Sequence, residues 1–338
     1  MRLKKIQRRH RNNLSKEEKK ELTKEQKLDS LIKKLNQDFG AGTIITKDNM
    51  PHVEVVRSRI YSLDAALGGG VAKGRIIEIA GNESSGKTTY ALHLIAEEQR
   101  NGGTAAFVDA EHALDFSYAR KLDVDTDNLL ITQPDSGEDA LSIVEAMCES
   151  GIINMIVIDS VAALVPRAEI EGEMGDSHMG LQARLMSQAM RKLTAVAHKS
   201  KTTLIFINQF RSKIGLYGGG KVTTGGNALK FYATQRVELW RPNKPIEKNG
   251  EPIGIQVEAN VIKNKIAPPF QKASLFVRWG QGFDRYIDIL RTAVEQGVVA
   301  KGGGGWHTYG DLRIQGEDKM AEAIKEKNLY EELVEKLK

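Results

Sequence analysis

Short apolar runs alternate with longer stretches of helical spacing between about residues 53 and 280. Each run is compact and ends at a polar or acidic residue, and the runs are Arg75–Ala80, Thr104–Asp109, Leu129–Thr132, Met155–Asp159 and Thr203–Asn208. Continuous apolar runs are typical of strands buried on both faces of a parallel sheet, and the stretches between them are long enough for helices. The alternation therefore predicts an α/β fold with a twisted, mostly parallel sheet flanked by helices.

The pattern changes on either side of this region. Residues 253–261 alternate between apolar and polar, which predicts half-exposed strands that continue the sheet. Apolar residues recur at helical spacing at Leu28, Leu31, Ile32 and Leu35, which predicts a short helix. Gly40 is expected to end it. Such a helix is too short to be stable alone, so it must pack on its own body or on a neighbouring subunit.

These patterns divide the chain into four expected parts. A basic N-terminal extension covers residues 1–27, and the helix with its linker covers residues 28–52. The α/β core covers residues 53–283, and residues 284–338 form a small C-terminal α/β domain, where the pattern indicates helices around a turn at Gly302–Gly305.

Composition narrows the class of protein. Of 338 residues, 41% are hydrophobic and 28% are charged, which suffices for a buried core and argues against disorder of the whole chain. No apolar run approaches the roughly 18 residues of a membrane span, and the basic start lacks the apolar block of a secretory signal. The single cysteine, Cys148, excludes an intramolecular disulfide and a multi-cysteine metal cage, so we expect a reducing, cytoplasmic location and no membrane partner.

The charge is unevenly distributed. The net charge is 49 − 44 = +5, but residues 1–28 hold 11 cations and 4 anions (+7), which leaves 38 and 40 (−2) for the rest. The body is therefore not a nucleic-acid binder by bulk charge, and a DNA site in it would need a few well-placed cations. The composition of the basic N-terminal extension fits a solvated segment, a contact with nucleic-acid or lipid phosphates, or a transit peptide.

The strongest chemical motif is a phosphate-binding loop. Residues 81–88, Gly-Asn-Glu-Ser-Ser-Gly-Lys-Thr, match the pattern G-x-x-x-x-G-K-[ST] between a predicted strand and a predicted helix. Glycines let backbone N–H groups curl around phosphate oxygens, and the helix N-terminus adds positive potential. Lys87 would neutralise the β- and γ-phosphates, and Thr88 would offer its hydroxyl to Mg²⁺.

Acidic and amide side chains end three of the predicted strands. Asp159 follows the apolar run Met155–Ile158 and is expected to anchor Mg²⁺ near the phosphates. Glu111 follows the run that ends at Asp109 and could orient and deprotonate an attacking water. The run from Thr203 ends in Asn208 and Gln209, and an amide there could sense the γ-phosphate. Ligands bind at the carboxyl ends of strands in such sheets, so these side chains are expected at one site.

Two long loops lack a core pattern. Residues 210–227 are rich in glycine and carry cations, a composition that suits contact with a phosphate backbone but also fits a plain mobile loop. Residues 169–180 are acidic, and charge alone does not indicate DNA binding there. The helix predicted over 181–198 carries Arg184 and Arg191 on one face, which also fits ordinary solvated surface.

Together these strings strongly resemble the bacterial RecA family of recombinases over about residues 28–325. The matching segments are Glu-Ser-Ser-Gly-Lys-Thr-Thr (83–89), Asp-Ala-Glu-His-Ala-Leu-Asp (109–115), Ile-Asp-Ser-Val-Ala-Ala-Leu (158–164), Gly-Asp-Ser-His-Met-Gly-Leu (175–181), Ser-Gln-Ala-Met-Arg-Lys-Leu (187–193), Ile-Asn-Gln (207–209) and Thr-Gly-Gly-Asn-Ala-Leu-Lys-Phe-Tyr (224–232). The resemblance implies a DNA-dependent ATPase that forms filaments on single-stranded DNA, pairs that strand with a homologous duplex and exchanges strands in DNA repair. It also implies contacts with a LexA-type repressor and with mediator proteins.

The resemblance assigns the ATP site residue by residue. Glu111, Lys87 and Gln209 are implied as catalytic residues, and Thr88 and Asp159 as holders of Mg²⁺, the latter through water. The implied nucleotide contacts are Gly81, Glu83, Ser84, Ser85, Gly86, Lys87, Thr88, Thr89, Asp115, Tyr118, Asp159, Lys263 and Lys265. Asp115 and Tyr118 would contact the adenine. Lys263 and Lys265 would reach a neighbour's nucleotide, and Phe231 would pack at the same interface.

For DNA the resemblance identifies both loops, including the acidic one that composition would miss. The implied contacts are Met179, Arg184, Ser187, Arg191, Arg211, Lys213, Ile214, Gly225, Gly226 and Asn227. The sequence departs from the family pattern in several places: Asn82 replaces the usual proline, the second loop is slightly shorter, and the end, residues 331–338, lacks the long acidic tail common in bacterial members. The basic N-terminal extension is longer than is usual in the family and could add DNA affinity.

Three other functions remain as alternatives. A hexameric helicase or clock-type ATPase would keep the phosphate loop but lack the strings 175–181 and 224–232, which this chain has. A filament with vestigial hydrolysis would not need Glu111 and Asp159. A small-molecule kinase would need an acceptor pocket, whereas the two loops suggest a polymeric ligand.

Overall fold

The computed structural model describes residues 23–40, 43–44, 53–173, 180–212, 221–242, 244–248 and 250–338. The chain divides into two units at residues 52 and 53. In the first unit, helix α2 spans Lys24–Phe39 and begins with a capping box, in which Thr23 and Gln26 exchange side-chain and backbone hydrogen bonds. The predicted helix is thus confirmed and starts four residues earlier. Leu28, Leu31 and Phe39 are exposed on it.

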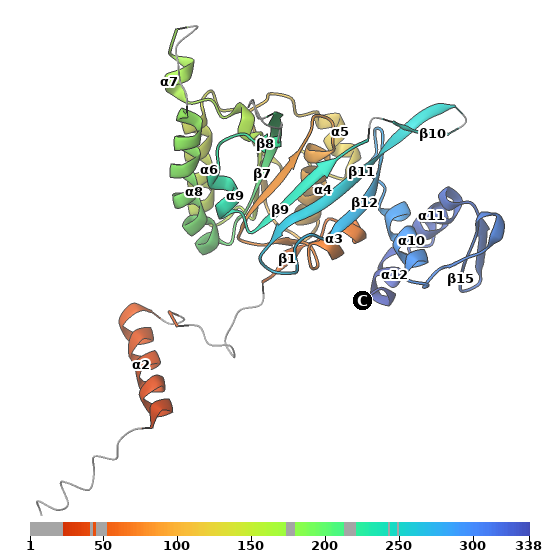
Figure 1. Ribbon diagram of the computed structural model, residues 1–338, viewed down its shortest axis with the longest axis horizontal. Coiled ribbons are helices and arrows are strands. Elements are labelled where there is room, and N and C mark those ends of the chain that lie inside the picture. Colours follow the sequence, from red (N-terminus) through yellow and green to blue (C-terminus); the bar gives the residue numbers. More distant parts are fainter. Residues whose placement is uncertain are drawn as a thin grey trace, which may run out of the picture. The chain divides into compact units, whose positions relative to one another are not determined.

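A central sheet organises the second unit (Figure 1). Its order in the described chain is β13 (Gly282–Phe283), β12 (Lys272–Arg278), β11 (Glu251–Asn264), β9 (Gln235–Trp240), β3 (Ile76–Gly81), β7 (Thr203–Ser212), β6 (Met155–Asp159), β4 (Ala105–Asp109) and β5 (Leu130–Thr132). Strands from β9 to β5 are parallel, and β11 to β13 are antiparallel. β10 (Ile246–Lys248) pairs with β11, and β8 (Lys221–Thr223) pairs with β7.

Helices cover both faces of this sheet, as the alternating pattern predicted. One face carries α3 (Tyr61–Ala66), α4 (Lys87–Arg100) and α5 (Phe116–Lys121). The other carries α6 (Gly137–Glu149), α8 (Leu181–Ser200) and α9 (Ala228–Tyr232). After β6 the chain makes two short helical turns, η2 (Val161–Ala163) and α7 (Arg167–Ile170), and β1 (Val55–Val56) pairs with β2 (Val71–Ala72) outside the sheet.

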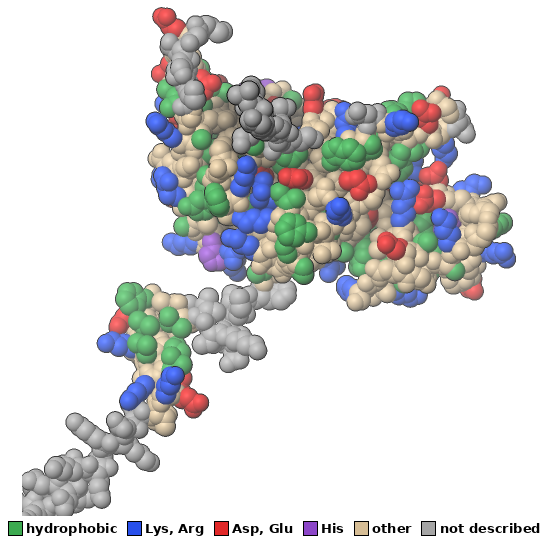
Figure 2. Space-filling model, in the orientation of Figure 1, with side chains coloured by type: hydrophobic (Ala, Val, Ile, Leu, Met, Phe, Trp, Pro, Cys, Tyr) green, Lys and Arg blue, Asp and Glu red, His purple; other side chains and the backbone are tan. Residues whose placement is uncertain are grey.

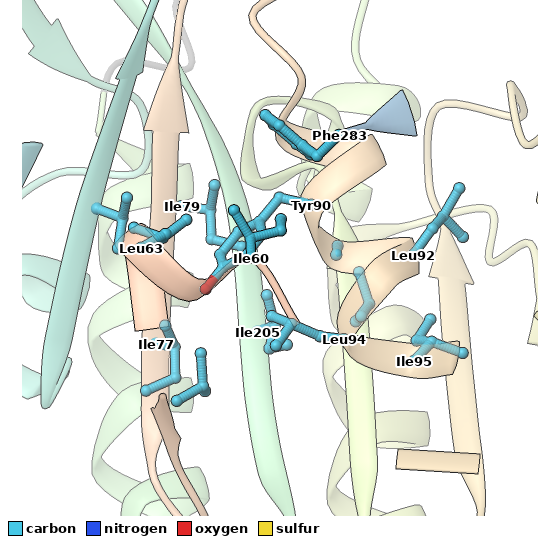
Figure 3. Close-up of a cluster of buried hydrophobic side chains, with 14 of the residues drawn as sticks. Ile60, Leu63, Ile77, Ile79, Tyr90, Leu92, Leu94, Ile95, Ile205 and Phe283 are labelled. Carbon is cyan, nitrogen blue, oxygen red and sulfur yellow. The ribbon is translucent and has the colours of Figure 1, made fainter. Parts of the chain in front are cut away.

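The core on the α4 side fixes the start of that helix. Figure 3 shows Ile79 of β3 and Ile205 of β7 close to Tyr90 and Leu94 of α4. All four side chains are fully buried, and each large apolar side chain contributes roughly 1.5–3 kcal/mol by leaving water. The ring of Tyr90 also meets Phe283 edge-on at 6.3 Å between centroids. This packing holds α4 rigidly against the sheet edge where β3 ends.

The C-terminal region contains a small sheet that the apolar pattern missed. Its elements are α10 (Arg285–Glu295), β14 (Ala300–Lys301), η3 (Gly303–Gly305), β15 (Trp306–Tyr309), β16 (Leu312–Gln315), α11 (Glu317–Glu326) and α12 (Tyr330–Lys336). β14, β15 and β16 form an antiparallel sheet beside the three helices. Hydrogen bonds tie this region to the core, because Ser62 donates its backbone N–H to buried Asp288 (2.9 Å) and Tyr330 donates to the Arg59 carbonyl (2.8 Å). Among the described helices, none is long and apolar enough to cross a membrane.

Candidate nucleotide and DNA site

The phosphate loop connects β3 to α4 at the carboxyl ends of the parallel strands. β3 ends at Gly81, where an added Cβ would lie 2.4 Å from Ser85 Oγ and 2.6 Å from the Leu239 carbonyl, so the turn has no room for a side chain. Gly86 caps α4 in the left-handed conformation (φ 86°). The loop therefore curls tightly and presents the N-terminus of a fourteen-residue helix to whatever it binds.

Lys87 and Thr88 open this helix and face the carboxylate that ends β6. Thr88 donates its hydroxyl to Asp159 Oδ2 at 2.6 Å, and Lys87 Nζ donates to the Asn82 carbonyl at 2.8 Å across the loop. Burial raises the pKa of Asp159 to about 6, with Glu111 adding to the rise, while the bond from Thr88 and the Lys87 charge lower it. Burial lowers the pKa of Lys87, and the nearby carboxylates offset part of that effect.

The loop also holds a buried polar atom without a partner. Ser85 is fully buried, and its hydroxyl makes no hydrogen bond within the described residues. Unpaired buried hydroxyls are rare because each costs about 1–3 kcal/mol. A polar hydroxyl, a lysine and a helix N-terminus around one tight loop fit a phosphate group. Among the described residues, no three His, Cys, Asp or Glu side chains are placed so that they could hold a metal ion by themselves, so a cation here would also need ligands from phosphate or water.

Glu111 lies next to the Thr88–Asp159 pair, on a turn that Asp109 holds by hydrogen bonds. Asp109 accepts bonds from the backbone N–H groups of Ala113 (3.1 Å) and Leu114 (3.3 Å), which fixes the turn. Glu111 Oε1 then accepts from Gln209 Nε2 at 2.8 Å and from the Ser160 hydroxyl. The turn after β4, the end of β6 and a residue within β7 thus bring Glu111, Asp159 and Gln209 together, as their positions in the sequence predicted, although β7 continues to Ser212, beyond its predicted end at Asn208.

A cavity adjoins the phosphate loop. It measures about 320 Å³, and its lining includes Ser84, Gly86, Tyr118 and Trp279. Tyr118 shares a hydrogen bond of 3.1 Å with Thr89 Oγ1. Trp279 is 52% exposed, and sequence reasoning did not single it out. The one signal in the sequence was a tryptophan at the turn of residues 279–281 between two strands.

Asp115 does not line this cavity; instead it caps α5. Its Oδ1 accepts from the backbone N–H groups of Ser117 (2.8 Å) and Tyr118 (3.0 Å), and these bonds lower the pKa of the carboxyl. The cap fixes the helix that carries Tyr118. Glu83, also expected to contact nucleotide, is exposed on the loop.

The exits of the two long loops meet at helix α8. Gln182 donates to the carbonyls of Val161 (2.8 Å) and Leu164 (3.2 Å), which ties the start of α8 to the turn after Asp159. At Gly225 (φ 76°) an added Cβ would lie 2.7 Å from Val161 Cγ1, so the second loop leaves through a gap that only glycine fits. The same turn therefore supports both loop exits beside the nucleotide site.

Several residues expected to contact DNA project from these elements. Arg184 and Arg191 are exposed on α8, and Figure 2 shows Lys and Arg side chains along that helix. Ser187 is half-buried and donates to the Ala183 carbonyl at 2.7 Å. Arg211 and Asn227 are exposed, and Gly226 follows Gly225 at the second loop's exit. Met179, Lys213 and Ile214 lie outside the described residues.

The remaining expected residues are not at this chain's own phosphate loop. Lys263 Nζ donates to the carbonyls of Lys230 and Phe231, both at 2.8 Å, at the end of α9. Burial lowers its pKa, and the charges of Lys265 and Arg236 lower it further. Lys265 is exposed, and Phe231 is 73% exposed. These side chains form a separate surface around α9 and the end of β11.

The fold and this arrangement define a class: a P-loop nucleotide hydrolase, with strand, loop and helix at the carboxyl edge of a parallel sheet. Comparisons narrow the class. A profile described as the RecA N-terminal domain matches residues 26–284. Protein RecA from Thermus thermophilus is 52% identical over 317 residues, which cover 92% of this chain and 93% of that protein. RecA from Syntrophus aciditrophicus is 53% identical over 305 residues, or 88% of each chain.

This chain belongs to the RecA family. It is therefore a DNA-dependent ATPase that mediates strand exchange in recombination and repair, and it binds DNA and forms filaments.

Proposed function

We propose that the loop at residues 81–88 binds the phosphates of ATP. Lys87 Nζ would exchange the Asn82 carbonyl for β- and γ-phosphate oxygens, and the orphaned Ser85 hydroxyl would gain a partner. The Thr88 hydroxyl and Asp159 lie 2.6 Å apart and would together hold Mg²⁺, Asp159 through water. When bound, Mg²⁺ supplies charge neutralisation at the phosphates.

Glu111 is the general base in this proposal. Gln209 and Ser160 both donate to Oε1 of its carboxylate. The other oxygen, Oε2, would orient a water and accept its proton. Gln209 would detect the γ-phosphate, because its amide already lies at the carboxylate that faces the reacting group. Since β7 continues directly into the second loop, a shift of Gln209 would be passed to the DNA-binding segment.

The cavity between Tyr118 and Trp279 supports a second assignment, the slot for adenine. It opens beside the phosphate loop and has aromatic side chains in its lining, which suit stacking of a flat base. Asp115 does not line the cavity and would act there through the helix that it caps.

The two loops with α8 form the proposed single-stranded DNA site. Arg184, Arg191 and Arg211 are exposed cations near the loop exits, and the glycines at the exit of the second loop let its backbone approach phosphates closely. Met179 and Ile214 are proposed as apolar wedges between bases. Double-stranded DNA would be paired along the same filament.

Neighbouring copies would share the nucleotide. Lys263, Lys265 and the exposed Phe231 lie away from this chain's own phosphate loop, which supports a role at the next chain's nucleotide. The exposed apolar residues of α2 would pack on a neighbour. In this scheme residues 53–283 are the ATPase core, residues 284–338 are a separate small domain, and a LexA-type repressor and mediator proteins are further partners of the filament.

The observation that carries the proposal is the contact of Glu111 with Gln209 beside the Thr88–Asp159 pair. We expect Glu111→Gln to lower hydrolysis about 100-fold or more while ATP-dependent DNA binding persists. Lys87→Ala should lose both activities. Glu247→Gln, the same change on exposed strand β10, is the control and should match the wild type. Glu111→Gln hydrolysing at the wild-type rate would refute the assignment.

A further inference from the structure

Four polar side chains meet inside the sheet next to the nucleotide site. Three come from strands β3, β7 and β9 and one from the residue after β8, and we call them the Asn208 cluster: Glu78, Asn208, Thr224 and Arg236. Asn208 Nδ2 donates to Glu78 Oε1 at 2.8 Å and to the Thr224 carbonyl at 3.2 Å. Asn208 Oδ1 accepts from the Thr224 hydroxyl at 2.6 Å and from the Gln209 backbone N–H at 2.9 Å. Glu78 Oε2 completes the cluster with an ion pair to Arg236 Nε.

This cluster is buried and its central amide is fully used. Glu78 and Asn208 are 0% exposed, and Thr224 is 8% exposed. An amide can make four hydrogen bonds, two through nitrogen and two through oxygen, and all four are made by Asn208. Since any displacement would leave buried polar atoms unpaired, the three strands and the segment at Thr224 are held in one arrangement, or must move to another together.

The cluster contacts both the strand that enters the second loop, β7, and the segment that leaves it, β8 with Thr224. β7 and β8 pair in antiparallel register, with Phe210 opposite Thr223 and Arg211 opposite Val222. Asn208 precedes Gln209 on the entering arm, and it holds the exiting arm through two atoms of Thr224. The backbone N–H of Thr224 also donates to the Gln209 carbonyl at 3.3 Å. One side chain therefore connects the Gln209 backbone to both ends of this segment.

The same cluster extends toward the surface that holds Lys263. Arg236 lies opposite Glu78 in β3 on one side and opposite Lys263 in β11 on the other. Lys263 in turn holds the last turn of α9, the helix that follows the loop exit. Polar contacts thus run from Gln209 through Asn208 and Glu78 to Arg236, which lies opposite Lys263 in the strand register.

We propose that Asn208, supported by Glu78, is a positioning residue that transmits the nucleotide state from Gln209 to the exit of the second loop. The inference rests on the proposed roles of Gln209 and of that loop in binding phosphate and DNA. When Gln209 shifts toward a γ-phosphate, its backbone N–H pulls on Asn208 Oδ1, and the Thr224 hydroxyl bound to the same oxygen follows. ATP and DNA then bind cooperatively because both favour one arrangement of the cluster.

Two adjacent threonines give a matched test. Thr224 donates its hydroxyl to Asn208, whereas the Thr223 hydroxyl is buried without a partner in the described chain. Thr→Val removes a hydroxyl at nearly constant shape at both positions, and only Thr224→Val breaks the cluster. The measured quantity is the coupling ratio, which is the dissociation constant for fluorescent oligo(dT) with ADP divided by that with a non-hydrolysable ATP analogue.

We expect Thr224→Val to lower the coupling ratio about fivefold or more, with Thr223→Val and Thr224→Ser close to the wild type. Hydrolysis without DNA should stay within about twofold of the wild type, which a merely structural defect would not allow. Thr224→Ala removes the same hydroxyl and replaces the valine variant if that one fails to fold.

The outcomes separate this inference from the function on which it rests. An unchanged ratio in Thr224→Val, or an equal drop in Thr223→Val, overturns the role of Asn208. The variant Gln209→Ala tests the underlying sensor. If Gln209→Ala loses the coupling while Thr224→Val keeps it, only the further inference fails; if Gln209→Ala keeps the coupling, the proposed sensor fails as well.

Discussion

Removing the Trp279 side chain should weaken nucleotide binding without disturbing the fold. The residue is 52% exposed, so a base stacked on it would cover about half of the roughly 200 Å² of a tryptophan side chain. At about 25 cal/mol per Å², that burial contributes about 2.5 kcal/mol, close to the upper end for one stacked base. Trp279→Ala should therefore raise the dissociation constant for ATP by about 10- to 60-fold.

The assay is a fluorescence titration with ATP labelled on the ribose, so that the base remains unmodified. Trp279→Phe keeps a ring and should lose only a fraction of the affinity. Trp306→Ala removes the same side chain from β15 in the C-terminal sheet, outside the slot, and is the control. Unchanged affinity in Trp279→Ala, or an equal loss in Trp306→Ala, would show that the cavity beside the phosphate loop does not hold the base.

Three further predictions follow from burial, backbone geometry and charge. Burial raises the pKa of Asp288 to about 6 from the ordinary 3.8, so the folded state binds an extra proton between these values. The free energy of unfolding should then fall by up to about 3 kcal/mol as the pH rises from 4 to 6, and urea titrations of Asp288→Asn should lack this decrease; parallel curves would contradict it. Gly225→Ala places a Cβ 2.7 Å from Val161 Cγ1 at a positive φ, so it should lower stability by about 1–3 kcal/mol and weaken DNA binding, whereas Gly297→Ala, with open space at a similar φ, should cost only its backbone strain. Arg191→Ala should reduce the slope of DNA affinity against salt by about one unit, and an unchanged slope would place Arg191 away from the phosphates.

The parallel core could be predicted from the sequence because its strands are buried on both faces. Such strands appear as continuous apolar runs, and β6 has the predicted bounds Met155–Asp159. The C-terminal region was expected to be α/β, but the apolar pattern did not place the strands of its sheet. Its strands have two to four residues each, and only one face of β15 is buried, so they carry little periodicity.

The site residues likewise fall into two groups: those in a continuous sequence motif, which could be predicted, and those that only the fold brings together. The phosphate loop is a continuous string, so Lys87 and Thr88 could be found from spacing alone. The Trp279 cavity and the Asn208 cluster join residues more than a hundred positions apart, such as Asn208 and Glu78, and only folding brings them together. The surface of Lys263 was predicted by resemblance, but its two carbonyl partners on α9 could not be.

The most direct test of the account is the rate of ATP hydrolysis per chain, measured with and without single-stranded DNA over a range of protein concentrations in Mg²⁺. If the nucleotide lies between neighbouring chains and controls the DNA-binding loops, DNA should raise the rate, and the rate should rise with concentration as neighbours supply Lys263 and Lys265. A rate that responds to neither DNA nor protein concentration would contradict the account.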